Sequence, residues 1–106
     1  MGAEIGRAEA EAIRAAALSV PGVAGLSGGQ FGEVALLLPG AKIPGIRPLT
    51  ADGRRGVELH VVYATDQGCP IADVATQLRE DVAAAADLDF INIIFADATA
   101  NTTRAL

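Results

Sequence analysis

The stretch from residue 57 to residue 95 constrains the fold most, because it alternates between strand and helix patterns. Residues 57–63 alternate in side-chain character, which is typical of a strand with one buried face. A helical apolar stripe follows in residues 71–86, formed by Ile71, Val74, Ala75, Leu78, Val82 and Ala85. Residues 90–95, FINIIF, are apolar on nearly both faces, which favours a strand in the centre of a sheet. A helix between two strands is a natural crossover, so these two strands are predicted to run parallel in one sheet.

The residues before position 39 add a second helix and two short apolar runs. Residues 4–18 are rich in Ala and Glu and place apolar side chains on one side, although Glu9 also falls there. Pro21-Gly22 ends this helix, because proline lacks a backbone donor and disfavours helix in the residue before it. Residues 23–26 indicate a brief strand, and residues 33–38, EVALLL, fit either a buried strand or a helical turn.

The resulting order of elements, α-β-β-β-α-β, predicts an α+β fold. We expect a two-layer sandwich in which a mixed β-sheet of three to four strands carries both helices on one face. With 106 residues, the chain corresponds to about one domain. We assign residues 1–97 to that domain and residues 98–106 to a flexible, polar C-terminal tail.

Residues 39–56 form the segment with the fewest regular features, since they contain three Pro and four Gly. We interpret this segment as a long irregular loop, of which one half could itself be a strand, and Asp52-Gly53 predicts a hairpin turn. This segment is also positively charged, because it contains one acidic residue, Asp52, and four basic residues: Lys42, Arg47, Arg54 and Arg55. These four residues are our candidates for binding an acidic partner or anionic lipid, and the alternative is an ordinary solvated loop.

The overall charge balance argues against nucleic acid as a partner. The net charge is −5, and phosphate contacts need clustered Lys and Arg. No stretch approaches the ~18–20 apolar residues that span a bilayer, so we expect no direct membrane insertion. The N-terminus lacks the basic and then apolar pattern of a signal peptide, so we expect a cytoplasmic protein. The single cysteine excludes an internal disulfide and a cysteine-cluster metal site, and we expect no cofactor.

Few residues offer chemistry. His60 is the one side chain whose ordinary pKa suits proton transfer near neutral pH, but no nucleophile motif accompanies it. Cys69 precedes the second helix, yet its charged neighbours are acidic, which does not favour a reactive thiolate. The glycines between positions 22 and 32 match no phosphate-binding pattern and indicate turns, and Glu80-Asp81 lies on the outer helix face. We therefore predict no catalytic residues and a protein that is not an enzyme.

The order of these pieces resembles the alkaline-shock-protein family, the envelope stress response proteins of Gram-positive bacteria, in its high-GC branch. Residues 20–29, VPGVAGLSGG, resemble the V-x-G-V-x-x-L-x-G-G segment of the family, and FGE and LPG follow at its spacing. Residues 56–63 resemble its G-V-x-V-x-V-x-V-x-Y strand, and residues 70–82 resemble its P-I-x-x-V-A helix. Residues 91–93, INI, take the place of its closing strand. The connectors 64–68 and 86–90 depart from the family pattern, which leaves the subfamily and the partner open.

The resemblance implies a function without catalysis. By this resemblance, we expect a small cytoplasmic α+β domain that is associated with cell-envelope stress and is held near the membrane by a membrane-anchored partner. We therefore expect a self-associating scaffold or adaptor that docks on such a partner. Two alternatives stay open: a small α+β domain that binds nucleic acid or a ligand, and an enzyme that uses His60 or Cys69.

Overall fold

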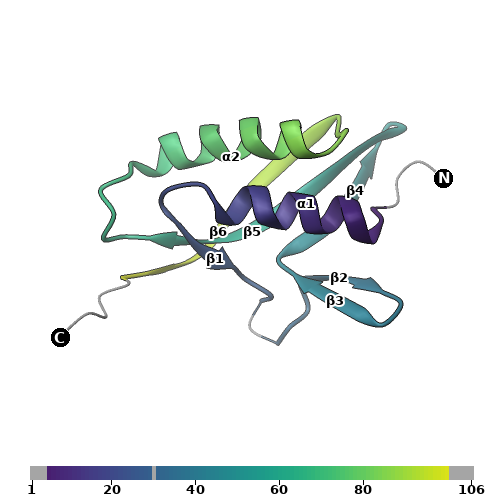
Figure 1. The fold of residues 1–106 in the computed structure, drawn as a ribbon, viewed down its shortest axis with the longest axis horizontal. Coiled ribbons are helices and arrows are strands. Elements are labelled where there is room, and N and C mark those ends of the chain that lie inside the picture. The colour runs from purple at the N-terminus through teal and green to yellow at the C-terminus, as the bar shows by residue number, and fades with distance from the viewer. Residues whose placement is uncertain (1–4, 30, 101–106) are drawn as a thin grey trace.

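A computed structural model describes residues 5–29 and 31–100, which contain two helices and six strands (Figure 1). In chain order these elements are α1 (Arg7–Leu18), β1 (Val23–Leu26), β2 (Ala35–Leu38), β3 (Ala41–Pro44), β4 (Ile46–Ala51), β5 (Arg54–Ala64), α2 (Ile71–Ala85) and β6 (Phe90–Thr99). The predicted α+β class and the two-layer arrangement are confirmed, since both helices cover the same face of the main sheet (Figure 1).

Strand β5 organises the four-stranded sheet, because every other strand of that sheet pairs with it. One edge of β5 is shared: β4 pairs antiparallel with its first half, and β1 pairs antiparallel with its last residues. The other edge pairs with β6, which runs parallel and is reached through α2, as the crossover pattern predicts. Strands β2 and β3 form a separate two-stranded antiparallel hairpin.

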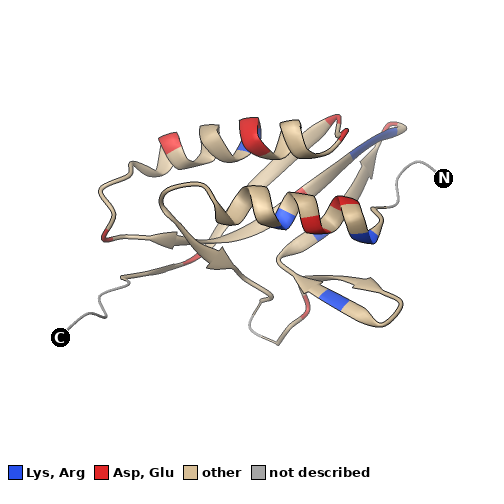
Figure 2. Ribbon diagram, in the orientation of Figure 1, with Lys and Arg blue, Asp and Glu red and all other residues tan. Residues whose placement is uncertain are grey.

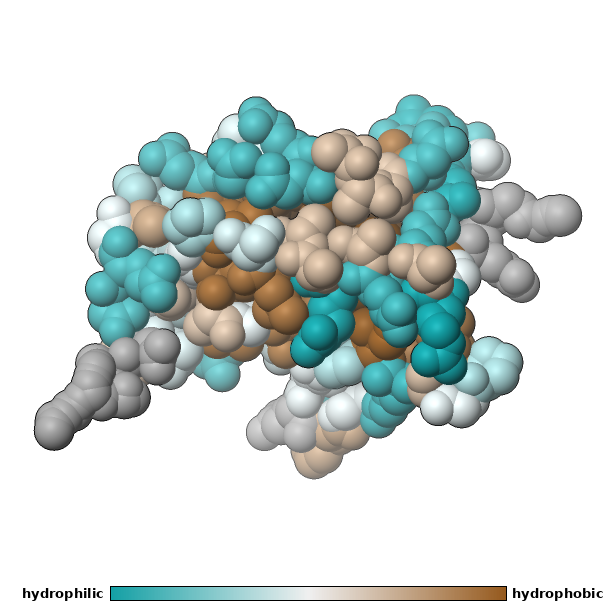
Figure 3. All heavy atoms as spheres, in the orientation of Figure 1, coloured by the Kyte–Doolittle hydropathy of each residue, from teal (hydrophilic) through white to brown (hydrophobic). Residues whose placement is uncertain are grey.

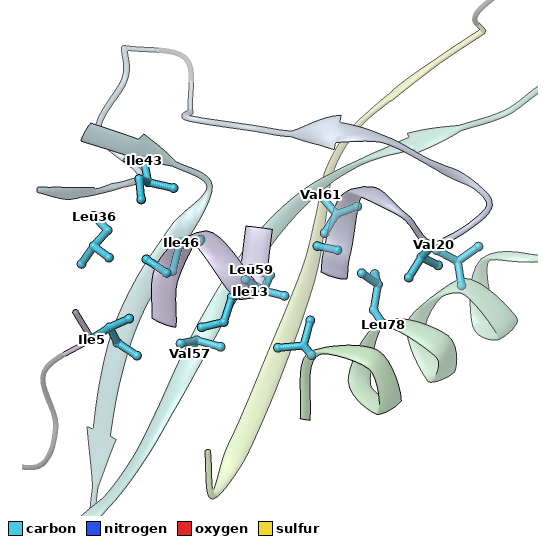
Figure 4. Close-up of a cluster of buried hydrophobic side chains, with 14 residues drawn as sticks. Ile5, Ile13, Val20, Leu36, Ile43, Ile46, Val57, Leu59, Val61 and Leu78 are labelled. Atoms are coloured by element: carbon cyan, nitrogen blue, oxygen red, sulfur yellow. The ribbon is translucent and has the colours of Figure 1, made fainter. Parts of the chain in front are cut away.

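The core lies between the helices and the helix-facing side of β5 (Figure 4). Ile13 from α1, Leu59 from β5 and Leu78 from α2 are fully buried there. Their periodic spacing along the sequence is the reason that these elements form, because each element hides one apolar face from water. The small side chains of Ala10 and Ala17 are also fully buried and let α1 lie close to its neighbours.

Two expectations about the strands are wrong. Residues 39–56 were predicted to be a long irregular loop with one half that could be a strand, but most of them form β3, β4 and the start of β5. Their prolines lie where a missing N–H is tolerated, at the end of β3 and within a strand that has β5 on one side. The predicted turn at Asp52-Gly53 is confirmed, since it joins β4 to β5. Strand β6 was predicted to be central, but it pairs with β5 alone among the described residues and forms an edge of the sheet.

The boundaries of the elements also shift. Helix α1 begins at Arg7, and residues 1–3 and Glu4 lie outside the described residues. Strand β6 continues through Thr99, so Ala98 and Thr99 belong to the sheet and not to a tail that begins at residue 98. The prediction of a flexible tail otherwise falls on residues 101–106, which lie outside the described part of the chain.

Candidate functional site

The four predicted partner-binding residues do not meet in one patch. They are distributed over three strands, and Figure 2 shows the basic residues scattered over the molecule. Arg47 on β4 lies 3.4 Å from a carboxylate oxygen of Glu58 on β5. Arg54 places its guanidinium carbon 5.9 Å from the ring centre of Phe90, within the range of a cation–π contact. Three of the four are thus engaged by their own chain, because Arg55 also has a carboxylate partner.

Arg55 explains a residue that breaks the pattern of the first helix. Its guanidinium lies 2.5 Å from a carboxylate oxygen of Glu9, and both side chains are about three-quarters buried. Glu9 falls on the apolar side of the helix by its spacing, and Arg55 of β5 provides a cation that meets it there. The pair fixes the start of α1 against the β4–β5 hairpin.

Lys42 on β3 is different, because it forms no salt bridge within residues 5–29 and 31–100. In the hairpin register it lies opposite Leu37 of β2. Its ammonium group also reaches the turn at Gly32, since a Cβ placed on that glycine would lie 3.4 Å from Nζ. Lys42 therefore brings the β2–β3 hairpin and the Phe31-Gly32 turn together at the surface.

Two large apolar side chains accompany this lysine at the surface. Leu37 is 74% exposed and Phe31 is 86% exposed, the highest values among the large hydrophobic residues of the described chain. The opposite face of the hairpin is buried, because Leu36 and Ile43 pack into the core. We define the hairpin surface as Phe31, Leu37 and Lys42: two exposed apolar side chains and one cation that forms no salt bridge within the described residues.

His60 lies on the face of β5 that the helices do not cover. Its Nε2 lies 2.9 Å from the same Glu58 oxygen that Arg47 approaches. The ring also lines a cavity of about 530 Å³ together with Ser27, Gly29, Glu33, Val34, Ala96 and Asp97. The sequence pattern gave no means of placing Glu33 or Asp97 at the same cavity as His60, because these residues are distant in the sequence.

The polar groups of this cavity are already bonded within the chain. The pKa of Glu33 is lowered, because its carboxylate accepts hydrogen bonds from its own backbone N–H and from that of Phe31 and because His60 lies near. The Ser27 hydroxyl accepts the backbone N–H of Gly29 at 3.2 Å, and Asp97 Oδ1 accepts that of Ala98 at 2.8 Å. The carboxylates of this cavity and the Ser27 oxygen therefore serve as acceptors for backbone N–H groups of the loops around it.

Cys69 and the glycine-rich turns have structural environments. The Cys69 thiol is half-buried, lies 3.6 Å from the carbonyl oxygen of Gln67, and lines a small cavity of about 250 Å³. The backbone carbonyl of Cys69 accepts the Tyr63 hydroxyl, which ties the loop before α2 to β5. Gly29 has a φ of +85°, a backbone conformation that favours glycine. This agrees with the prediction that the glycines of this segment form turns.

The surface that sequence reasoning missed is the outer edge of β6. This strand has no second neighbour among the residues that the structure describes, and it bears only one charged side chain, Asp97. Ile94 is 39% exposed on the face away from the helices. An apolar sequence gave no signal of edge position, because central strands and unprotected edge strands share that composition.

In the part of the chain with described placement, no three His, Cys, Asp or Glu side chains gather in a way that could hold a metal ion. No described helix has the length and apolar character needed to cross a membrane. The chain matches no protein-family model, no curated protein and no solved structure.

Proposed function

We propose that this chain is a non-enzymatic envelope stress response protein that self-associates and docks on a membrane-anchored protein from the cytoplasmic side. The family resemblance in residues 20–29, 56–63 and 70–82 suggests this role. The observation that carries it is the hairpin surface, where Phe31 and Leu37 expose apolar area that a monomer in water gains nothing by showing.

The hairpin surface also specifies the kind of partner. An apolar segment covers Phe31 and Leu37, and an acidic side chain beside it faces Lys42, which forms no salt bridge within the described residues. Apolar contact supplies most of the affinity, and the lysine orients the partner. The scattered positions of Arg47, Arg54 and Arg55 support a role in the fold more than a role at this surface.

Membrane fractionation with matched variants tests this proposal. The full chain is expressed with a tag in a Gram-positive bacterium, and its share in the membrane fraction is measured for the wild type, Phe31→Ser/Leu37→Ser, and Ile71→Ser. We expect membrane association for the wild type and for Ile71→Ser, whose side chain is 45% exposed on α2, and a loss for the hairpin variant.

Purified components distinguish a protein anchor from the lipid itself. The purified chain is mixed with vesicles of anionic phospholipid that contain no protein, and we expect no binding, since the net charge is −5. Binding to bare vesicles, or a wild-type chain that stays in the soluble fraction of cells, would overturn the proposal of a membrane-anchored protein partner. Equal membrane association of the hairpin variant would overturn the assignment of the docking surface.

A further inference from the structure

The unpaired edge of β6 exposes backbone hydrogen-bonding groups. On β5, the His60 N–H donates to the Gly45 carbonyl and the His60 carbonyl accepts from Ser27, so its backbone faces β4 and β1. Backbone direction alternates along a strand, so the neighbours of His60 face β6 instead. In the parallel register, Val57 of β5 lies opposite Ile91 of β6. When one residue of such a pair directs its backbone groups toward the partner strand, the opposite residue directs its own away. The backbone N–H and C=O groups of Ile91, Ile93 and Phe95 therefore point away from β5.

This edge lacks the features that normally prevent association of exposed strands. Residues 90–96 contain no Pro, no Lys and no charged side chain. Such an edge, uncharged and rich in β-branched and aromatic residues, is a template for pairing with another strand. The other edges of this sheet differ, because β1 has only four residues and β4 carries Pro48 and Arg47.

An uncharged strand edge on an otherwise acidic chain suits a second copy of this chain as the occupant. Each copy carries a net charge of −5, so two copies repel one another overall, and α2 carries several of the acidic side chains (Figure 2). The uncharged stretch 90–96 is where two copies can meet without placing like charges opposite each other. Symmetric dimers commonly use one self-complementary patch of this kind.

We infer that β6 pairs antiparallel with β6 of a second copy, about a two-fold axis that passes beside Ile94. In that register Ile93 lies opposite Phe95 of the other copy, and both have backbone groups that face outward. The two Ile94 side chains meet across the axis on the face away from the helices, which covers an exposed apolar residue. The two Asp97 side chains lie at opposite ends of the paired stretch, so their carboxylates stay apart. The β-bulge between Phe95 and Asp97 ends the regular ladder.

This inference rests on the self-association in the proposed function and names the surface that mediates it. It does not involve the hairpin surface, which stays free to bind the membrane-anchored partner. The dimer then has a continuous sheet that runs through both copies, with the helices of both copies on the same side.

Light scattering coupled to size exclusion of the purified full chain is the first experiment. The wild type is expected to have twice the monomer mass of 10.8 kDa. Ile94→Lys places a charge at the centre of the proposed interface and is expected to weaken the dimer by roughly 30-fold or more, as for a central interface residue. Ile71→Lys is the matched control, because Ile71 is similarly exposed, and it is expected to keep the dimer. Circular dichroism checks that both variants fold.

Cross-linking tests the register independently. In a Cys69→Ser background, Ile94→Cys is expected to form a disulfide-linked dimer under mild oxidation, because residues at a non-hydrogen-bonded antiparallel position lie close enough for a disulfide. Ile71→Cys in the same background is expected to stay monomeric on a non-reducing gel.

The outcomes separate the two proposals. A monomeric wild type overturns self-association and the edge pairing together, and leaves membrane docking to the fractionation experiment. A wild-type dimer that persists in Ile94→Lys and does not cross-link at position 94 overturns the β6 edge alone. A dimer lost in Ile94→Lys and captured by the cysteine at position 94 supports the inference, whatever the docking experiment shows.

Discussion

Gly45 connects β3 to β4 and thereby holds the hairpin surface against the main sheet. Its φ is +86°, a conformation that L side chains rarely adopt. A Cβ placed there would lie 2.6 Å from the Cβ of Leu26 and 3.2 Å from the carbonyl oxygen of His60. Its own backbone N–H donates to the Val34 carbonyl at 2.9 Å. Gly45→Ala therefore meets two separate penalties, one of conformation and one of space.

Two other glycines allow these penalties to be separated. Gly53 has a φ of +77° and open space around its Cα, so Gly53→Ala reports the conformational penalty alone, about 1–2 kcal/mol. Gly25 has no unusual φ and no atom within 4 Å of an added Cβ, so Gly25→Ala is expected to change stability by less than about 0.5 kcal/mol. Overpacking adds about 1–3 kcal/mol, so Gly45→Ala is expected to cost about 2–5 kcal/mol.

Urea unfolding followed by far-ultraviolet circular dichroism measures these three free energies, since the chain has no tryptophan and one tyrosine. A domain of this size has a total stability of about 5–15 kcal/mol, so Gly45→Ala should shift the midpoint well below that of Gly53→Ala. Equal midpoints for the two variants would refute the reasoning, because they would show that the contacts with Leu26 and His60 carry no penalty. If Gly25→Ala were as unstable as Gly53→Ala, the loss in Gly53→Ala could not be assigned to backbone conformation, and the separation of the conformational penalty from the steric one would be refuted.

Three further perturbations test the core, a carboxylate and a salt bridge. Leu78→Ala, at a fully buried position of α2, is expected to lower the free energy of unfolding by about 2–5 kcal/mol in the same urea assay. The lowered pKa of Glu33 stabilises the fold above the ordinary carboxyl range, and this contribution is lost as pH falls through the lowered value. The difference in free energy of unfolding between the wild type and Glu33→Gln should therefore be largest at neutral pH and vanish in strong acid. A difference that does not change with pH would contradict this prediction. Glu9→Gln removes the carboxylate from a largely buried pair and is expected to cost about 1–3 kcal/mol in the same assay, because Arg55 keeps its charge and loses its partner, and high salt should reduce this cost only slightly.

Local hydrophobic periodicity was sufficient to predict the helices and strands that bury one face in the core. The stripe of 71–86 and the alternation of 57–63 place Leu78 and Leu59 in the core, as predicted, because helical and strand spacing are fixed by backbone geometry. The crossover between parallel strands also followed from the order of these elements. The exposed Ile71 is an exception, since it is the first residue of its helix and extends beyond the sheet-facing stripe.

The candidate surfaces depend on contacts between residues far apart in the sequence. Composition could group Lys42 with three arginines, but only folding showed that Arg47 and Arg55 meet Glu58 and Glu9 and that Lys42 lies beside Leu37. A charge can be counted in a sequence, whereas its partner is determined by which strands pair.

The sequence by itself determined the fold class, the two helices and the residues of the central core. The apolar band that Figure 3 shows between the helices belongs to that layer. Tertiary structure decided which strand lies at the edge: β4 and β1 together occupy one side of β5, so β6 receives the other side alone. Hydrophobicity reports whether a side chain is removed from water, and it carries no information on which backbone groups find a partner.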